Sequence, residues 1–221
     1  MKLAEIKKLN IREFVERYPF VQTISVKGEK CFYKEDYEDG TKAGDPMVEF
    51  GPGHDFGGWT DILLCWAEKV KPYYDKMSPE MKENFYILDL KEKYGDMRLY
   101  LSGYPTGEFE KIKEYTDMVE HLSTFTCFQC GHISRASRAD KLLTWRTDGW
   151  ISYYCKDCAK KYLRRDNKEY GIKMSKAKFK QAFNDTFKRI EGDWFARFVT
   201  YNGDKKEHIA YDCRELLEGM F

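Results

Sequence analysis

The sequence predicts an α+β fold: a small antiparallel sheet packed with helices, an inserted four-cysteine zinc ribbon and a helical C-terminal extension. Three observations predict it. Apolar residues recur at helical spacing in several segments, two short runs alternate as strands around a turn, and four cysteines form two C-x-x-C pairs. Hydrophobic residues make up 42% and aromatic residues 16% of the 221 residues, which is enough for a packed core.

We expect three regions along the chain. Residues 1–122 form the α+β core, residues 123–166 the zinc ribbon, and residues 167–221 the C-terminal extension. No apolar run approaches the roughly 18 residues that a membrane-spanning helix needs, and the first residues lack the apolar core of a signal peptide. We therefore expect a soluble protein of the cytoplasm, with no membrane partner.

The N-terminal part of the core is expected to hold one helix and one or two strands. Apolar residues from Leu3 to Val15 follow helical spacing, and Pro19 closes the helix. Residues 21–33 alternate as strands would. An acidic, glycine-rich loop at 35–58 follows, since this stretch is too rich in turn-forming residues for regular structure.

Helix, hairpin and helix are predicted for the rest of the core. The expected elements are a helix from Trp59 to Tyr73, a short helix capped by Ser78, strands at 85–90 and 97–101, and a helix over 108–122. In the turn between the two strands, Gly95 suits a left-handed backbone. Asp96 and Arg98 are interpreted as a pair that stabilises this turn.

The C-terminal extension is predicted to be mainly helical. A short basic helix from Asp157 to Arg165 leads into it, and an apolar stripe from Phe179 to Trp194 predicts one helix. A polar turn at 202–204 precedes a last short helix near 214–218.

The two cysteine pairs have the spacing of a structural zinc site. Cys127 and Cys130 form the first pair, Cys155 and Cys158 the second, with 24 residues between them. Structural zinc is tetrahedral and prefers thiolates that arrive in such short-range pairs. Four protein ligands leave no open position, so we expect one structural zinc ion that does no chemistry.

Other interpretations of the cysteines remain open at this stage. The pairs could form disulfides or a redox dithiol, although a reducing compartment and the doubled spacing favour zinc. His132 could replace one cysteine as a ligand. Cys31, Cys65 and Cys213 lack partner spacing and are interpreted as small buried hydrophobic residues.

Several motifs, taken in order, resemble a known family. They are Gly57-Gly-Trp-Thr-Asp-Ile-Leu63, Leu90-Lys-Glu-Lys-Tyr-Gly-Asp-Met-Arg-Leu-Tyr100, Thr126-Cys-x-x-Cys-Gly131 and Gly149-Trp-Ile…Cys-x-x-Cys158. Over about residues 55–160 the chain is similar to small, uncharacterised zinc-ribbon proteins of bacteria, phages and prophages. Those proteins typically carry a shorter loop with Pro-Gly after the first pair. The resemblance implies an accessory protein of a mobile element in a bacterial cytoplasm and carries no activity over.

Charge and aromatic residues suggest two kinds of partner. The net charge is only +1, yet residues 127–165 hold nine Lys and Arg against three Asp. Aromatic residues interleave with these cations, which is typical of nucleic-acid binding. The candidate binding residues are Arg135, Arg138, Arg146, Lys160, Arg164 and Arg165.

Docking on a host protein or complex is the interpretation that the sequence favours slightly. Aromatic and Arg residues anchor protein interfaces, the overall charge is nearly neutral, and the resemblance fits a modulator carried by a phage. An enzyme is the third interpretation: His54 and Asp55, with Glu49 and Asp61 nearby, could form an acid/base or metal cluster of a hydrolase or nuclease. The chain lacks the common catalytic motifs and suggests no small-molecule substrate, so we expect no catalytic residues.

Overall fold

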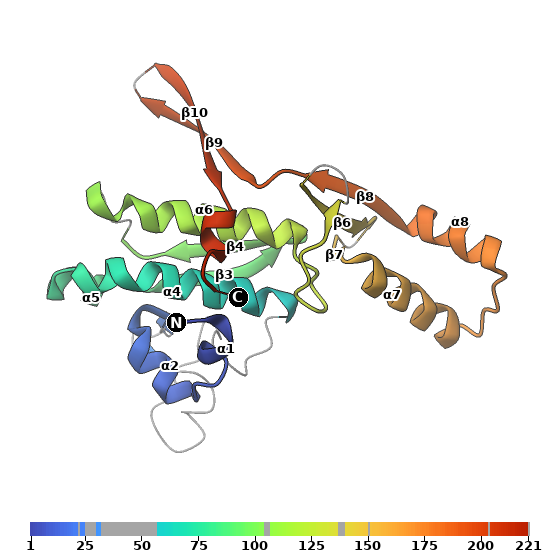
Figure 1. Cartoon of the computed structure of the whole chain (residues 1–221), viewed down its shortest axis with the longest axis horizontal. Helices are drawn as coiled ribbons and strands as arrows, with labels where there is room; N and C mark the ends of the chain where they lie inside the picture. Colours follow the sequence, from blue (N-terminus) through green and yellow to red (C-terminus); the bar gives the residue numbers. More distant parts are fainter. Residues whose placement is uncertain are drawn as a thin grey trace.

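The computed structural model confirms the α+β class, with helices packed against small antiparallel sheets (Figure 1). It describes residues 1–21, 23–24, 30–31, 57–103, 107–136, 140–149, 151–202 and 204–220. In this part of the chain no helix has both the length and the apolarity that crossing a membrane requires.

Two long helices and a β-hairpin form the centre of the structure. Helix α4 (Thr60–Lys76) follows the short helix η2 (Gly57–Trp59), and α6 (Glu110–Phe125) follows η3 (Gly107–Phe109). Strands β3 (Ile87–Lys93) and β4 (Asp96–Leu101) pair antiparallel, with alternate residues of β4 buried. The two long helices and both strands were predicted from the sequence to within a few residues, whereas η2 and η3 were not predicted.

The hairpin turn has the backbone that its sequence favours. Tyr94 and Gly95 both have positive φ, 57° and 85°, as a two-residue turn with the twist of the strands requires. Arg98 lies 3.6 Å from Asp96, which fits the expected turn-stabilising pair.

The single N-terminal helix that we expected is wrong, because the chain divides it into α1 (Leu3–Ile6) and α2 (Ile11–Arg17). Asn10 is the cause. Its side chain accepts a hydrogen bond from the Glu13 amide, and the Glu13 carboxylate accepts one from the Asn10 amide, both at 2.9 Å. This capping box starts a new helix at residue 11.

The elements around the central helices agree with the sequence where they are described. Strands β1 (Thr23–Ile24) and β2 (Lys30–Cys31) pair antiparallel, and Ser78 caps α5 (Pro79–Asn84) by accepting from the Met81 amide at 3.2 Å. The acidic loop lies outside the described residues except for Gly57 and Gly58, which belong to η2.

A second lobe holds both cysteine pairs, and the segment between the pairs contributes three strands to its sheet. Central strand β6 pairs with two short strands along one edge and with β8 along the other. The strands are β5 (Arg135–Ala136), β6 (Lys141–Thr147), β7 (Tyr153–Tyr154) and β8 (Phe187–Gly192), and the helices are α7 (Lys156–Glu169) and α8 (Lys176–Thr186).

The apolar stripe from Phe179 to Trp194 is helical only as far as Thr186, so the predicted helix is too long. Phe187 has extended dihedrals, φ −121° and ψ 124°, and begins β8. Along its open edge, β6 pairs with β8 at six positions, from Leu142 to Thr147. The backbone hydrogen bonds gained by this pairing outweigh the helical propensity that the spacing of the stripe indicates.

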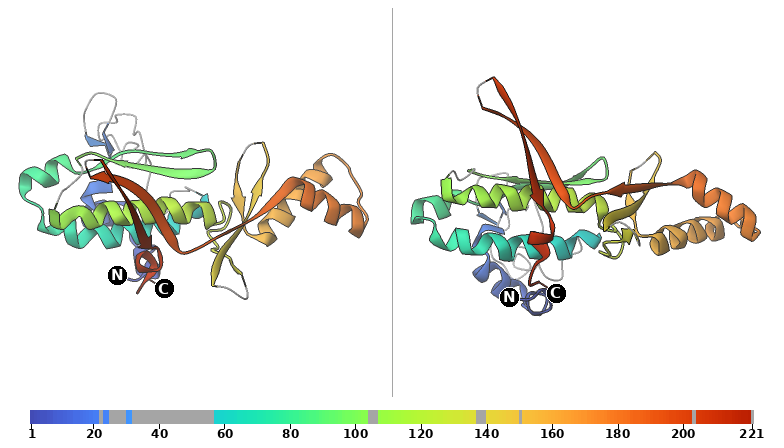
Figure 2. Two further views of the ribbon diagram at one scale, coloured as in Figure 1. Left: turned by 90° about the horizontal axis from the view of Figure 1, so that it is seen from above. Right: turned by 45° about the horizontal axis from the view of Figure 1, so that its top comes forward.

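The C-terminal extension is less helical than we expected, because the chain then returns to the central helices through a long β-hairpin. Strands β9 (Phe195–Asn202) and β10 (Lys205–Asp212) pair over their whole length and project away from α6 (Figures 1 and 2). The last helix, α9 (Arg214–Leu217), matches the predicted one. The Leu3 amide donates to the Met220 carbonyl at 2.8 Å, which places the two ends of the chain side by side.

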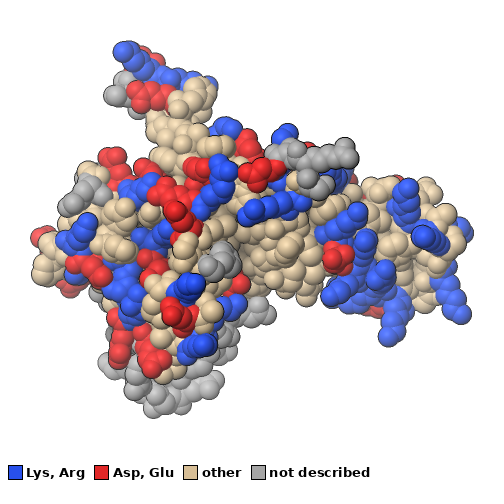
Figure 3. All heavy atoms as spheres, in the orientation of Figure 1, with Lys and Arg blue, Asp and Glu red and all other residues tan. Residues whose placement is uncertain are grey.

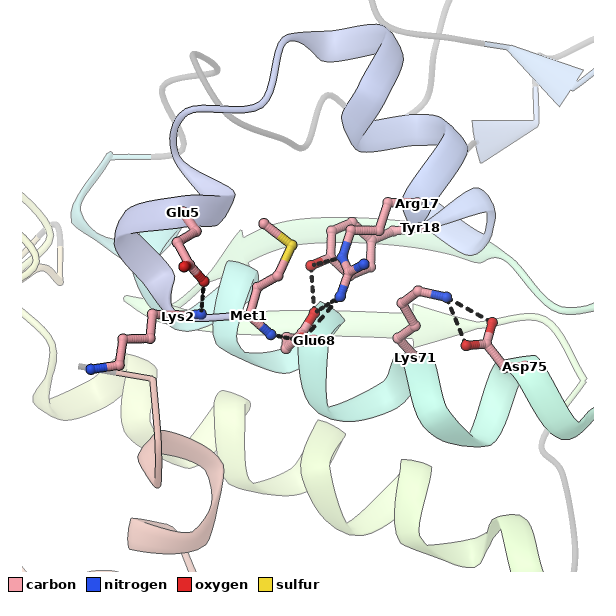
Figure 4. A network of polar contacts seen from close by, with 8 residues as sticks. All are labelled: Met1, Lys2, Glu5, Arg17, Tyr18, Glu68, Lys71 and Asp75. Atoms are coloured by element: carbon pink, nitrogen blue, oxygen red, sulfur yellow. Dashed lines mark hydrogen bonds and ion pairs between the residues drawn. The ribbon is translucent and has the colours of Figure 1, made fainter.

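Glu68 on α4 joins the N-terminal helices to the centre (Figure 4). It accepts hydrogen bonds from the Tyr18 hydroxyl at 2.6 Å, from the Arg17 guanidinium at 3.0 and 3.2 Å, and from the Met1 amino group. Burial disfavours the Glu68 carboxylate, but these donors outweigh burial and lower the pKa of Glu68.

We expect Glu68→Gln to lower the free energy of unfolding by about 2 kcal/mol at pH 7, because charge-assisted hydrogen bonds are lost. Since the folded-state pKa is lowered, this stabilisation is present above the unfolded-state pKa of about 4.3 and is lost as the pH falls through the folded-state value. Urea melts of the wild type and the variant at pH 7 and at about pH 3 measure the difference in unfolding free energy at each pH.

Asp75→Asn is the matched control for Glu68. Asp75 pairs with Lys71 one turn away on α4, and its side chain is 54% exposed. We expect a change within about 0.5 kcal/mol at either pH. An effect of Glu68→Gln that stays constant between the two pH values would contradict a role for the charge.

Candidate metal centre and basic groove

A tight turn after α6 presents the first cysteine pair. Thr126 and Ile133 form a β-bridge, and the Cys127 amide donates to the His132 carbonyl at 3.0 Å. The Gly131 amide donates back to the Cys127 carbonyl at 2.8 Å, and Gly131 takes φ 72°, which glycine adopts without strain. The turn therefore aims two thiols in one direction.

The second pair lies at the beginning of α7. Strand β7 delivers Cys155 to the N-cap position, where its sulfur accepts from the Cys158 amide at 3.4 Å. The amides at a helix N-terminus carry partial positive charge, which stabilises thiolates. Backbone amides also donate to the sulfurs of Cys127 and Cys130, so both pairs have backbone donors close to their sulfurs.

The structure brings all four predicted ligands together. The sulfurs of Cys127, Cys130, Cys155 and Cys158 lie within 4.8 Å of one another, so the group could hold a metal ion. Sulfurs around a tetrahedral ion with metal–sulfur bonds of about 2.3 Å are about 3.8 Å apart, and Cys130 and Cys155 are separated by 3.8 Å. The donor set and its size therefore fit one tetrahedral ion.

The geometry favours neither a disulfide nor a histidine ligand. The four cysteines are free, and the sulfurs of Cys130 and Cys155 are 3.8 Å apart, whereas a disulfide bond is about 2.0 Å long. Exposed His132 is not part of the sulfur group. Cys65 and Cys213 are fully buried, as expected for small hydrophobic residues, whereas the side chain of Cys31 lies outside the described part of the chain.

The cysteines differ in how readily they ionise. Burial raises the pKa of Cys127 to about 11, and burial together with the neighbouring thiols also raises the pKa of Cys158. Burial opposes ionisation of Cys130 as well, but the His132 amide and the surrounding thiols outweigh it and lower that pKa. A bound cation would ionise the remaining thiols, so metal binding releases protons.

The first cysteine turn rests directly on the N-terminus of α4. The Gly58 amide donates to the Phe128 carbonyl, and a Cβ at Gly58 would collide with the backbone of Cys127 and Gly131. Trp59 and Phe128 meet edge to face, with centroids 5.3 Å apart. Only glycine fits at position 58, so the turn and the core are in backbone contact.

A basic groove of about 900 Å³ opens beside the metal centre, between α7, α8 and the sheet. Its lining has two parts. The cations are Lys156, Lys160, Arg164, Lys176, Lys180 and Arg189, and the aromatic residues are Trp145, Phe179, Phe183 and Phe187. Ala177 and Asn184 are the other lining residues, so none of the described residues that line the groove is acidic.

Helical and strand periodicity bring these side chains together. Lys156, Lys160 and Arg164 follow at four-residue spacing along one side of α7. Lys176, Phe179, Lys180 and Phe183 follow at three- and four-residue spacing along α8. Trp145 on β6 lies opposite Arg189 on β8, and Phe187 is two residues away on the same face.

The predicted binding residues separate in space. Lys160 and Arg164 line the groove, and Arg165, next to Arg164 on α7, lies over the Tyr162 ring with its Cζ 5.4 Å from the centroid. Arg146 follows Trp145 on β6 and so faces the opposite side of the sheet, 3.9 Å from Asp148. Arg135 lies away from the groove, with its Cζ 4.9 Å from the centroid of the Trp194 ring. Arg138 lies outside the described residues.

Four of the six groove cations were not among the predicted binding residues. They are Lys156, Lys176, Lys180 and Arg189. The Lys-x-x-Phe-Lys-x-x-Phe pattern at 176–183 was an available signal, because it places cations and rings on one helical face. The contribution of Arg189 depends on the pairing of β8 with β6, which the sequence does not reveal.

The enzyme interpretation gains no site from the described residues. His54, Asp55 and Glu49 lie outside them, and Asp61 forms an ion pair with Lys7 at 2.7 Å. No family model, curated protein or solved structure matches this chain. The resemblance to phage zinc-ribbon proteins therefore stays a prediction.

We expect Cys127→Ser to abolish metal binding and to unfold the second lobe. Binding of structural zinc supplies about 10–16 kcal/mol of folding energy in small modules, and a hydroxyl replaces one thiolate poorly. Metal content by mass spectrometry and thermal melts measure both effects. Cys65→Ser is the control, since Cys65 is buried away from the sulfur group and should cost stability without loss of metal. A Cys127→Ser protein that kept one metal ion and its melting temperature would rule out the metal centre.

Gly58→Ala should lower both the unfolding free energy, by about 3 kcal/mol, and the metal affinity, because the added methyl group displaces the backbone of the first cysteine turn. The control is Gly171→Ala, where φ is +65° but no atom of the described residues lies within 4 Å of the added carbon. It should lose about 1 kcal/mol from backbone strain and retain its metal. Equal metal retention in both variants would show that the Gly58 contact does not support the turn.

Proposed function

We propose that this chain is a non-enzymatic nucleic-acid-binding protein in which one structural zinc ion holds a basic groove on a folded core. The single observation that carries the proposal is the lining of the groove, which among the described residues has six cations and no acidic side chain. Phosphates are the ligands that such a lining attracts. Zinc is the proposed ion because four thiolates in tetrahedral reach favour it and leave no open coordination position.

The surrounding surface supports the same proposal. Residues 156–192, which we call the basic arm, hold twelve Lys and Arg against five Asp and Glu, a balance of +7. The whole chain has a net charge of +1, so the remaining residues sum to −6. Figure 3 shows Lys and Arg side chains gathered over α7 and α8 with few acidic ones between them. The basic arm is therefore a local cationic surface.

Most groove cations are available to a ligand. Lys156, Arg164, Lys176 and Lys180 have no carboxylate partner within 4.0 Å among the described residues, and all four are exposed. Arg189 pairs with Glu191, and Lys160 lies 3.9 Å from Asp157. A polyanion would thus gain new ion pairs without breaking strong existing ones.

Docking on a host protein is the second candidate, and the β9–β10 hairpin favours it. The hairpin projects from the core (Figure 2) and exposes apolar side chains, with Phe195 36% and Val199 43% exposed. The resemblance to phage proteins supports an accessory role in a bacterial cytoplasm for either candidate. A stoichiometric protein that the tagged chain captures from a bacterial lysate after nuclease treatment would favour docking.

Binding of the wild-type protein to a labelled oligonucleotide should weaken steeply with salt. Neutralising six phosphates gives a slope of log affinity against log salt of about −4 for a single strand and about −5 for a duplex. Replacing Lys176 and Lys180 together by Ala should reduce the magnitude of the slope by about 1.4 for a single strand and about 1.8 for a duplex. Fluorescence anisotropy between about 50 and 200 mM salt measures it.

Lys205→Ala with Lys206→Ala is the matched control. These two exposed lysines lie on β10, away from the basic arm, and their removal should leave the slope unchanged. Absence of saturable binding by the wild-type protein at the lowest salt would overturn the proposal. Equal slopes for the wild type and the Lys176/Lys180 variant would show that the groove is not the binding site.

A further inference from the structure

We propose that the basic groove binds unpaired bases, so that the ligand is single-stranded nucleic acid or a single-stranded segment and not a regular duplex. This inference rests on the proposed function and adds the structural class of the ligand. It is carried by the aromatic rings of the groove, which phosphate binding alone does not require.

The rings form a graded surface between the two helices. Phe187 and Trp145 lie deepest, with 4% and 8% of their surface exposed. Phe179 and Phe183 on α8 are half-buried, and the Phe183 and Phe187 centroids are 5.1 Å apart with planes inclined by 33°. Phe179 and Phe183 thus offer ring area to a planar ligand above a packed aromatic base.

Cations border the rings at close range. The Lys156 ammonium lies 5.9 Å from the Trp145 centroid, and the Arg164 guanidinium lies 5.6 Å from the Phe179 centroid. Lys176 and Lys180 precede and follow Phe179 on the same side of α8. A nucleotide placed with its base on Phe179 would therefore have phosphate-binding groups on both flanks.

An unpaired nucleotide matches this arrangement better than a duplex does. A duplex presents phosphates to a protein but keeps its base faces stacked inside, so the rings of a recessed surface would stay uncovered. A single strand exposes both phosphates and base faces, and every base can stack on an aromatic ring whatever its sequence. We therefore expect little sequence preference.

The first test compares three probes of equal length on the zinc-loaded, full-length wild-type protein. They are a single-stranded oligonucleotide, a blunt duplex of the same sequence, and a single strand whose central nucleotides are abasic. Anisotropy at one low salt concentration should show about tenfold tighter binding of the intact single strand than of either other probe, because stacking contributes most of that difference.

The second test removes the rings but keeps apolar volume. Phe179→Leu with Phe183→Leu should weaken binding of the intact single strand about tenfold. The affinities for the abasic strand and for the duplex should stay unchanged. Tyr170→Leu is the matched control, because Tyr170 is a 75% exposed aromatic residue on the basic arm that does not line the groove. Circular dichroism and metal content establish that each variant is folded.

The outcomes separate this inference from the proposed function. Absence of binding to all three probes would overturn both. Equal affinity for the three probes, weakened in each case by the loss of Lys176 and Lys180, would overturn the inference and keep the proposed function. Displacement of the single strand by poly-glutamate as readily as by an unlabelled single strand would overturn the inference in favour of an acidic protein partner. The abasic comparison uses the wild-type protein, so it stands even if the double variant fails to fold.

Discussion

The basic groove depends on two cysteine pairs remaining within 4.8 Å of each other, although 24 residues separate them in sequence. The first pair is fixed to η2, the short helix that leads into α4, because the Gly58 amide donates to the turn that carries the pair. The second pair begins α7, and Lys156, the first cation of the groove, directly follows Cys155. The sulfur cluster therefore fixes the position of the first residues of α7, the helix that forms one wall of the groove. A metal ion there would connect the core to the basic arm without entering the groove.

Strand β6 is the second connection between the two lobes. Successive residues of a strand face opposite sides. Leu142 belongs to the hydrophobic core around α4 and α6, whereas Leu143 and Trp145 belong to a separate hydrophobic cluster in the second lobe. The same strand pairs with β8, which continues from α8 and ends where Gly192 meets the Phe125 ring of α6. Both groove walls are thus attached to the core, α7 through the cysteines and α8 through β6. Two attachments far apart in sequence constrain the width of the groove.

The sequence was most informative where a local rule decides the structure. Ser78 as a helix cap, Gly95 in its turn and the cysteine spacing each depend on a few adjacent residues, and the structure agrees with all three. The split at Asn10 was also a local signal, which the longer apolar stripe obscured. The strand at Phe187 could not be predicted, because its partner is β6, about 45 residues earlier in the chain. For the same reason Arg135 and Arg146, neighbours of the cysteines in sequence, lie away from the cations with which they were grouped.

Net charge is a poor guide to the electrostatics of this protein. Exposed charges are screened beyond about 8 Å at physiological ionic strength, whereas the 14 residues of α7 alone span about 21 Å at 1.5 Å per residue. A phosphate in the groove would therefore interact mainly with the cations of α7, α8 and β8 that line it. The near-neutral net charge of +1 favours a protein partner when only the sequence is considered. That total adds the basic arm to the acidic remainder of the chain, and a ligand in the groove contacts the basic arm. For the proposed polyanionic ligand, the charge that matters is therefore the +7 of residues 156–192.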